Sequence, residues 1–437
     1  MKNICFVSNF KKTELFIEVS KYFQKENIFW ICVNLKELKK VSAVYDDSNI
    51  LFINKKNIKN EQFNSELKIN EIIFADRSLD NKNDLDKQFI LNSEKKIYEF
   101  IKNKNIEYIF GEFTWAHEVI INLVCKNNKD LNCKYLNPGA IRIIPGKFLF
   151  FESLDNSKYF TKKKLKESEI FNIEKNKYKN YIETFTIENK IFNFKLIINK
   201  IFKIIFNDYY DKYDPRKISK TQRIINFICK YFNFITFKMI KKISLNDVKS
   251  NKYIIYYLQK KPEANTDVKG IYYSDQIINI QNIWKILPIN TKLLIKQHPT
   301  CKGDNNYFFY KKITLLNDTY ILDDKINDNF LNRKPLATFS INSTASMESA
   351  ISGIPSFTFV NCFFNELKFS ERINLEDLKK FNLDQLILNM NLLNESKHEL
   401  NEIKFLKSSY KGHFYGDELM TVNNIKNISD AINEIIN

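Results

Sequence analysis

The sequence predicts an α/β protein with two Rossmann-like domains, and three observations lead to this class. Short apolar segments of strand length alternate with segments of helical periodicity, which is the pattern of βαβ units and of parallel sheets. The alternation fades near residue 150 and restarts at residue 253. The length of 437 residues also suits two or three domains better than one. Two doubly wound sheets that face a cleft are therefore expected.

The first domain is expected to span residues 1–155 and to open with a βαβ unit. Residues 2–7 have the apolar pattern of a buried strand, Thr13–Lys25 has helical spacing, and Phe29–Val33 has the pattern of a second strand. A later unit repeats the alternation, with a helix at Ser93–Lys104, a strand at Ile106–Phe110 and a helix at Ala116–Asn127.

Residues 156–250 are expected to form a basic helical insertion. The stretch 151–250 holds 22 Lys and Arg against 11 Asp and Glu, so it supplies +11 of the chain's formal charge of +17. A basic amphipathic helix such as Phe192–Phe206 can lie on an anionic membrane surface. The alternative is a hairpin between the domains whose lysines are only solvated.

The second domain is expected at 251–400, and 401–437 is expected to form terminal helices that pack back on the first domain. Strands fit 253–258, Lys292–Lys296, Thr319–Ile321, Leu336–Phe339 and Ser356–Phe359, and helices fit Ser274–Leu287 and Ala345–Ile351.

Composition excludes several classes of protein. Eight Gly residues in the whole chain leave no GxGxxG loop, and the seven Cys residues contain no CxxC pair. A disulfide framework and a zinc ribbon are therefore not expected. A location in the reducing cytoplasm is expected instead. The pair Asp84 and Asp86 matches a metal-binding Asp-x-Asp, but it lies in an exposed polar run with no strand before it, so no metal site is predicted.

Three segments of the second domain and one of the first follow predicted strands and carry candidate chemistry. His298 and Pro299 end an apolar strand, which presents the imidazole at the strand's carboxyl end. Asn342, Ser343 and Thr344 precede a helix whose N-terminus favours an anion, and Glu348 lies one turn further on. An ordinary helix cap is the alternative for these residues.

A polar stretch with Gln259, Glu263 and Thr266 follows the first strand of the second domain. In the first domain, Glu112 follows the strand Ile106–Phe110 and is the candidate general base, because that role needs a carboxylate at the ligand-binding edge. A surface carboxylate in a loop is the alternative for Glu112.

Together these segments resemble bacterial capsule and surface-polysaccharide glycosyltransferases of the GT-B architecture, similar to the Kdo-transferase and sialyltransferase-like enzymes that use CMP-activated sugars. The resemblance covers about 105–155 and 250–362. It is carried by the sequences around Glu112, Pro262-Glu263, His298-Pro299, Ser343–Glu348 and Gly353-Ile354-Pro355. The chain departs from the family pattern at Gln297, where Glu is usual.

The resemblance implies that His298, Pro299, Asn342, Ser343, Thr344, Glu348, Gln259, Glu263 and Thr266 hold a cytidine nucleotide. It implies catalytic roles for Glu112 and His298 and an acceptor side with Trp115 and Arg142, with no metal and no cofactor. The expected activity is transfer of a Kdo-like or sialic-acid-like sugar from a CMP-linked donor to a capsular or lipid-linked glycan. The expected location is the cytoplasm, at the inner face of the membrane.

Two rival functions stay open. A transferase of the same fold can move a glycerol-phosphate or ribitol-phosphate unit from a CDP-linked donor. A nucleic-acid-binding protein can use the basic stretch, and its binding would be salt-sensitive.

Overall fold

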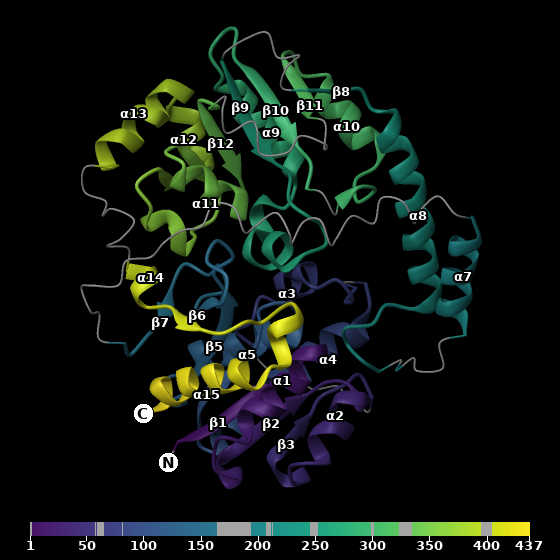
Figure 1. Ribbon diagram of the computed structural model, residues 1–437. Coiled ribbons are helices and arrows are strands. Elements are labelled where there is room, and N and C mark those ends of the chain that lie inside the picture. The colour runs from purple at the N-terminus through teal and green to yellow at the C-terminus, as the bar shows by residue number, and fades with distance from the viewer. Residues whose placement is uncertain are drawn as a thin grey trace. The chain divides into compact units, whose positions relative to one another are not determined.

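The computed structural model describes residues 2–56, 58, 65–80, 82–163, 194–206, 211, 213–244, 252–298, 301–322, 334–394 and 404–437. These residues form two compact units, each built around its own largely parallel sheet (Figure 1). The first unit takes the described parts of 1–167, 209–219 and 404–437, and the second takes those of 168–208 and 220–403. The α/β class predicted from the sequence is confirmed.

The sheet of the first unit has the order β15-β6-β5-β4-β1-β2-β3, and β7 also pairs with β6. Strands β5, β4, β1, β2 and β3 are parallel, whereas β6, β7 and β15 pair antiparallel. Because the chain leaves β1 toward β2 but returns as β4 on the other side, the topological switch point lies between β1 and β4. The strands are β1 (Asn3–Val7), β2 (Ile28–Cys32), β3 (Ile50–Phe52), β4 (Ile106–Phe110), β5 (Lys134–Ala140), β6 (Lys147–Phe151), β7 (Tyr159–Phe160) and β15 (Tyr410–Lys411).

Seven described α-helices belong to this unit. They are α1 (Phe10–Ser20), α2 (Leu35–Ser42), α3 (Ile69–Ala75), α4 (Asp84–Asn103), α5 (Ala116–Asn127), α14 (Lys404–Lys407) and α15 (Val422–Ile436), with short 3-10 turns at Lys25–Asn27, Asp47–Asn49 and Asp417–Met420. Helix α4 begins nine residues before the predicted start at Ser93, because Asn83 caps it by accepting a hydrogen bond from the Leu85 amide.

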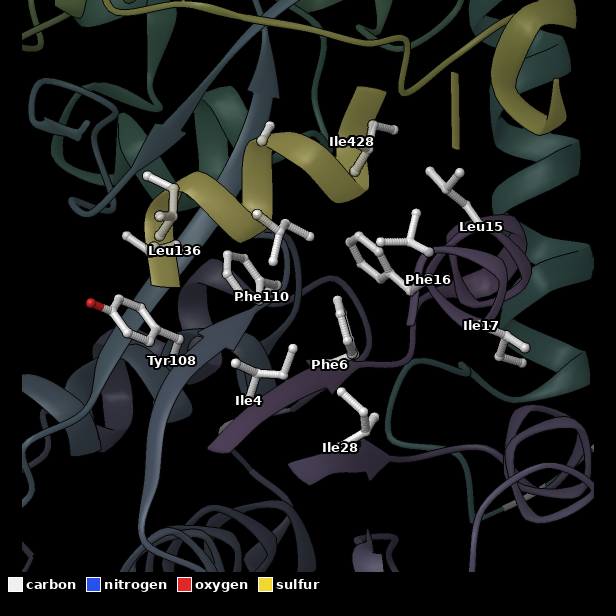
Figure 2. Close-up of a cluster of buried hydrophobic side chains, with 14 of the residues drawn as sticks. Ile4, Phe6, Leu15, Phe16, Ile17, Ile28, Tyr108, Phe110, Leu136 and Ile428 are labelled. Carbon is white, nitrogen blue, oxygen red and sulfur yellow. The ribbon is translucent and has the colours of Figure 1, made fainter. Parts of the chain in front are cut away.

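The C-terminal segment completes the core of the first unit. Strand β15 pairs with β6, and helix α15 packs against α1. Figure 2 shows Ile428 of α15 among Phe6, Phe110 and Phe16, all of them buried. Side chains from both ends of the chain therefore share one apolar cluster.

The sheet of the second unit has the order β14-β13-β12-β9-β10-β11-β8, and every neighbouring pair in it is parallel. Its switch point lies between β9 and β12, because β10 and β11 extend the sheet on one side of β9 and β12 on the other. The strands are β8 (Lys242–Ile243), β9 (Tyr253–Tyr257), β10 (Lys292–Lys296), β11 (Thr319–Leu322), β12 (Ala337–Ser340), β13 (Ser356–Thr358) and β14 (Ser370–Arg372).

The described α-helices of the second unit are α7 (Phe194–Ile205), α8 (Lys220–Met239), α9 (Gln276–Lys285), α10 (Tyr307–Thr314), α11 (Thr344–Ile351), α12 (Leu375–Lys380) and α13 (Leu383–Asn394). A π-helical turn covers Asn265–Lys269, and 3-10 turns cover Ile271–Tyr273 and Phe363–Glu366. Among the described residues, none of the helices combines the length and the apolar character needed to cross a bilayer.

Candidate functional sites at the switch points of the two sheets

A cluster of charged and amide side chains lies at the switch point of the first sheet. Asn9 and Lys12 follow β1, Glu112 follows β4, and Glu118 stands on the first turns of α5. The carboxyl ends of β1 and β4 are neighbours in the sheet, so residues about 100 positions apart in the sequence meet there. We call Asn9, Lys12, Glu112 and Glu118 the carboxylate cluster.

Asn9 bridges the two carboxylates of this cluster. Its Nδ2 donates hydrogen bonds of 2.8 Å to Oε2 of Glu112 and of 2.8 Å to Oε1 of Glu118. Lys12 Nζ forms an ion pair with Oε1 of Glu112. The second oxygen of Glu118 accepts the backbone amides of Thr114 at 2.8 Å and of Trp115 at 3.0 Å. These bonds fix Glu118 to the backbone that follows β4, and they tie Glu112 to side chains of the segment that follows β1.

The two carboxylates differ in their surroundings. The side chain of Glu112 keeps 17% of its surface exposed, whereas Glu118 is completely buried. Burial, and then the negative charge of Glu112, raise the pKa of Glu118 to about 7, although three N–H donors oppose the shift. Burial disfavours the charge of Lys12, but the Glu112 carboxylate and the Tyr415 hydroxyl outweigh it and raise the pKa of Lys12. Glu112 is thus the carboxylate that a ligand can reach.

Backbone strain marks the same edge of the sheet. Phe10 begins α1 with a φ of +45°, a region that a bulky side chain rarely adopts. Its amide donates to Oε1 of Glu37 at 2.9 Å, and the Arg216 guanidinium lies 4.3 Å from the centre of its ring. Trp115 is half-buried with its ring 6.1 Å from that of Phe10. Arg142 lies exposed in the turn between β5 and β6.

In the second unit, Gln259 and Asn342 meet at the switch point between β9 and β12. Gln259 Nε2 donates to Oδ1 of Asn342 at 2.8 Å, and its Oε1 accepts the backbone amide of Asn342 at 3.0 Å. Asn342 Nδ2 then reaches the carbonyl of Asn265 at 3.3 Å. Both the nitrogen and the oxygen of the Gln259 side-chain amide bond Asn342, so Gln259 positions the loop after β12.

The start of helix α11 follows this loop. Ser343 caps the helix, because its Oγ accepts the Ala345 amide at 3.1 Å. Thr344 is the first helical residue and is half-buried, and Glu348 is exposed one turn later. The Ser346 amide donates to the Ser343 carbonyl at 3.1 Å. The ordinary cap is therefore present, and an anion site at this helix start stays a prediction.

His298 is exposed directly after β10, and Pro299 lies outside the described residues. The preceding Gln297 is buried, donates from Nε2 to the carbonyl of Cys301 at 3.1 Å and accepts the Tyr310 hydroxyl at 2.9 Å. A glutamate carboxylate has no donor for the Cys301 carbonyl, so the amide fits this position. Gln297 therefore ties the end of β10, next to the exposed His298, to Cys301.

Two other predicted nucleotide residues shape the loop after β9. Thr266 is buried and donates from Oγ1 to the carbonyl of Lys260 at 2.7 Å. The Glu263 amide donates to Oδ2 of Asp267 at 2.8 Å, and the Glu263 side chain is half-buried. Nucleotide contact stays a prediction for both residues.

One expectation about the Asp-x-Asp pair is wrong. Asp84 is exposed, but Asp86 is buried in the first turn of α4, where it pairs with Lys55 at 2.5 Å and accepts the Asp80 amide at 2.8 Å. The pair is part of a helix start that sequence periodicity did not reveal. In the described part of the chain, no three His, Cys, Asp or Glu side chains are grouped so that they can hold a metal ion.

Sequence reasoning assigned no role to Asn9, Lys12 or Glu118. The sequence contains a signal for Asn9, since two polar residues follow an apolar strand directly. It contains no signal for the pairing of Lys12 with Glu112, because this pairing depends on which strands become neighbours in the sheet.

No family model matches the chain. A curated protein that matches is Protein Ycf2 of Physcomitrium patens, 24% identical over 496 residues that include 96% of this chain. The chain spans about a fifth of the length of that protein, since the match covers 20% of it.

Solved structures with similarity include two kinds of sugar-processing enzyme. KpsC of Thermosulfurimonas dismutans, a beta Kdo 2,7 transferase, is 11% identical over 78% of this chain and 90% of that one, with a TM-score of 0.35. The UDP-GlcNAc 2-epimerase of Neisseria meningitidis is 10% identical over 100% and 99% of the two chains, with a TM-score of 0.28. Scores this low carry no argument about activity, and the α/β class follows from the strand orders themselves.

Proposed function

We propose that the chain is a glycosyltransferase that moves a sugar from a CMP-linked donor to a capsular or other surface glycan. One observation carries the proposal. The polar segments that resemble such enzymes lie at the switch points of the two sheets, around Glu112 in the first unit and around Gln259 and Asn342 in the second. Open α/β sheets bind their ligands at these places.

The proposed mechanism gives each unit a separate task. In the second unit, His298 and the first amides of α11 stabilise the negative charge of the departing cytidine phosphate. In the first unit, Glu112 accepts the proton of the attacking acceptor hydroxyl. The proton passes to Glu112 Oε2 or Oε1 as the glycosidic bond forms, and the sugar–phosphate bond breaks with both electrons leaving on the phosphate. Lys12 positions Glu112 through its ion pair with Oε1.

Calorimetric titration of the full chain with CMP, CDP and UDP tests the nucleotide site. We expect CMP to bind and His298→Ala to weaken it roughly 10- to 150-fold, since a charge-assisted hydrogen bond contributes roughly 1.5–3 kcal/mol. His413→Ala is the matched control, because His413 lies on the first unit in the turn after β15. Equal affinities for the three nucleotides, or unchanged binding in His298→Ala, would contradict the proposal.

The same titration addresses the phosphotransferase alternative. If the donor is linked through CDP, CDP should bind more tightly than CMP, because the nucleotide site then recognises both phosphates.

The role of Glu112 is tested separately. Glu112→Gln keeps the shape of the side chain but removes its basicity, so we expect transfer to fall by a factor of about 100 or more while CMP binding is unchanged. Loss of CMP binding in this variant would show that Glu112 holds the donor and is not the base.

A further inference from the structure

Helices α7 and α8 have an unusual charge composition. Their sequences contain three and four Lys or Arg residues respectively and no Asp or Glu. The two helices lie side by side in the second unit (Figure 1), and Lys220 Nζ of α8 donates to the Ile205 carbonyl of α7 at 2.8 Å. We call them the basic hairpin.

Helix α8 has two apolar faces with different environments. Phe234 and Phe237 are buried against the second unit, with the Phe237 ring 5.0 Å from that of Tyr310. A second stripe is exposed, at 38% to 76% of each residue's surface, and consists of Ile225, Ile228, Phe232 and Met239. Spacings of three, four and seven residues put these four side chains on one face. At about 100° per residue, that face is opposite the buried one.

Helix α7 also presents apolar side chains to solvent. Ile198, Phe202 and Ile205 are exposed, and Phe206 directly after the helix is 65% exposed. The rings of Phe202 and Phe206 stack with their centres 5.5 Å apart. The hairpin therefore combines exposed aromatic and aliphatic stripes with charged residues that are all basic, of which Lys230 pairs with Asp304 outside the hairpin.

We infer that the basic hairpin is a docking surface for an anionic lipid bilayer. The acyl region of a bilayer accepts the exposed stripes, and negatively charged headgroups are attracted to the positive charge of the two helices. A second copy of this chain fits less well, because its hairpin would bring seven more basic residues and no acidic one. The inference is independent of the proposed transferase activity, since it uses no residue of either switch point.

Vesicle flotation with the full chain tests the inference. We expect the protein to float with vesicles of about 30% phosphatidylglycerol in phosphatidylcholine and not with pure phosphatidylcholine, and binding should weaken as salt is raised. The double variant Ile228→Ser/Phe232→Ser should bind anionic vesicles at least about tenfold more weakly. Phe308→Ser is the matched control, because Phe308 is 70% exposed on α10, outside the hairpin.

Three results would overturn the inference. They are absence of binding to the anionic vesicles, equal binding to neutral vesicles, and equal loss of binding in Phe308→Ser. Light scattering, which measures the mass of the particle in solution, adds a fourth. If the unmodified chain is a dimer and Ile228→Ser/Phe232→Ser is a monomer, the hairpin binds a second copy of the chain and not a bilayer. The exchanged side chains are exposed, so a circular dichroism spectrum like that of the unmodified chain is expected and shows that folding is intact.

Discussion

Replacing Glu118 by Gln should change how the stability of the first unit depends on pH. The pKa of Glu118 is raised from 4.5 to about 7 in the folded chain, so between these values the folded state holds a proton that the unfolded state has released. The folded state then binds more protons, and its stability falls as pH rises. The contribution of Glu118 is fully present below pH 4.5 and is lost as pH rises through about 7.

The magnitude follows from the shift. A difference of about 2.5 pKa units at about 1.36 kcal/mol each gives about 3 kcal/mol, and complete burial leaves no solvent screening to reduce it. The amide that replaces the carboxyl group in Glu118→Gln does not titrate. The free energy of unfolding of the unmodified chain, minus that of Glu118→Gln, should therefore fall by about 3 kcal/mol between about pH 4.5 and 8.

Urea unfolding followed by tryptophan fluorescence measures this difference. A Trp284→Phe background confines the signal to the first unit, because Trp30 and Trp115 are the other two tryptophans of the chain. Glu26→Gln is the control, since Glu26 is exposed in a turn of the same unit. A difference that stays constant with pH, or that grows as pH rises, would refute the reasoning.

Three further variants test the described contacts by urea unfolding. Gln297→Glu should lower the free energy of unfolding by about 1–3 kcal/mol, and more at pH 8 than at pH 5, because the ionised carboxylate faces the Cys301 carbonyl. Arg216→Ala should lower the free energy of unfolding by about 3–5 kcal/mol, because it removes the cation that pairs with the buried carboxylates of Glu37 and Asp214. Ile428→Ala should cost about 2–5 kcal/mol through the cavity it leaves in the shared core.

Each of these expectations has a contrary result. A pH-independent effect of Gln297→Glu, a change below about 1 kcal/mol in Arg216→Ala, or an Ile428→Ala variant as stable as the unmodified chain would show that the corresponding contact is not made as described.

Local sequence patterns predicted the strands better than the helix boundaries. Strands Ile106–Phe110 and Lys292–Lys296 and helix Ala116–Asn127 were predicted with the bounds that the structure has, because turn or polar residues flank segments rich in apolar residues. Helix α1 begins at Phe10 and not at the predicted Thr13, since its start depends on the Phe10 backbone conformation. Periodicity carries no signal for such a conformation.

Only some residues of the candidate sites could be predicted from the sequence. Glu112 and the loops around His298 and Asn342 follow apolar strands, which is a local signal. Asn9 follows an apolar strand in the same way, but its contact with Glu112, like that of Lys12, could not be predicted, because it depends on the pairing of β1 with β4. In the sequence, Gln297 is a departure from a family pattern. The structure gives its physical reason, because its side-chain amide donates a hydrogen bond to the carbonyl of Cys301.

The sharing of one apolar cluster by both ends of the chain has a consequence for biosynthesis. Helix α15 and strand β15 leave the ribosome after all of the second unit, whereas β1, β2 and β4 emerge long before it. The apolar surface that α15 covers in the folded unit therefore stays exposed while the second unit is being synthesised. Nascent chains should therefore recruit holdase chaperones until synthesis reaches the last helix, and the second unit can mature first despite being translated later.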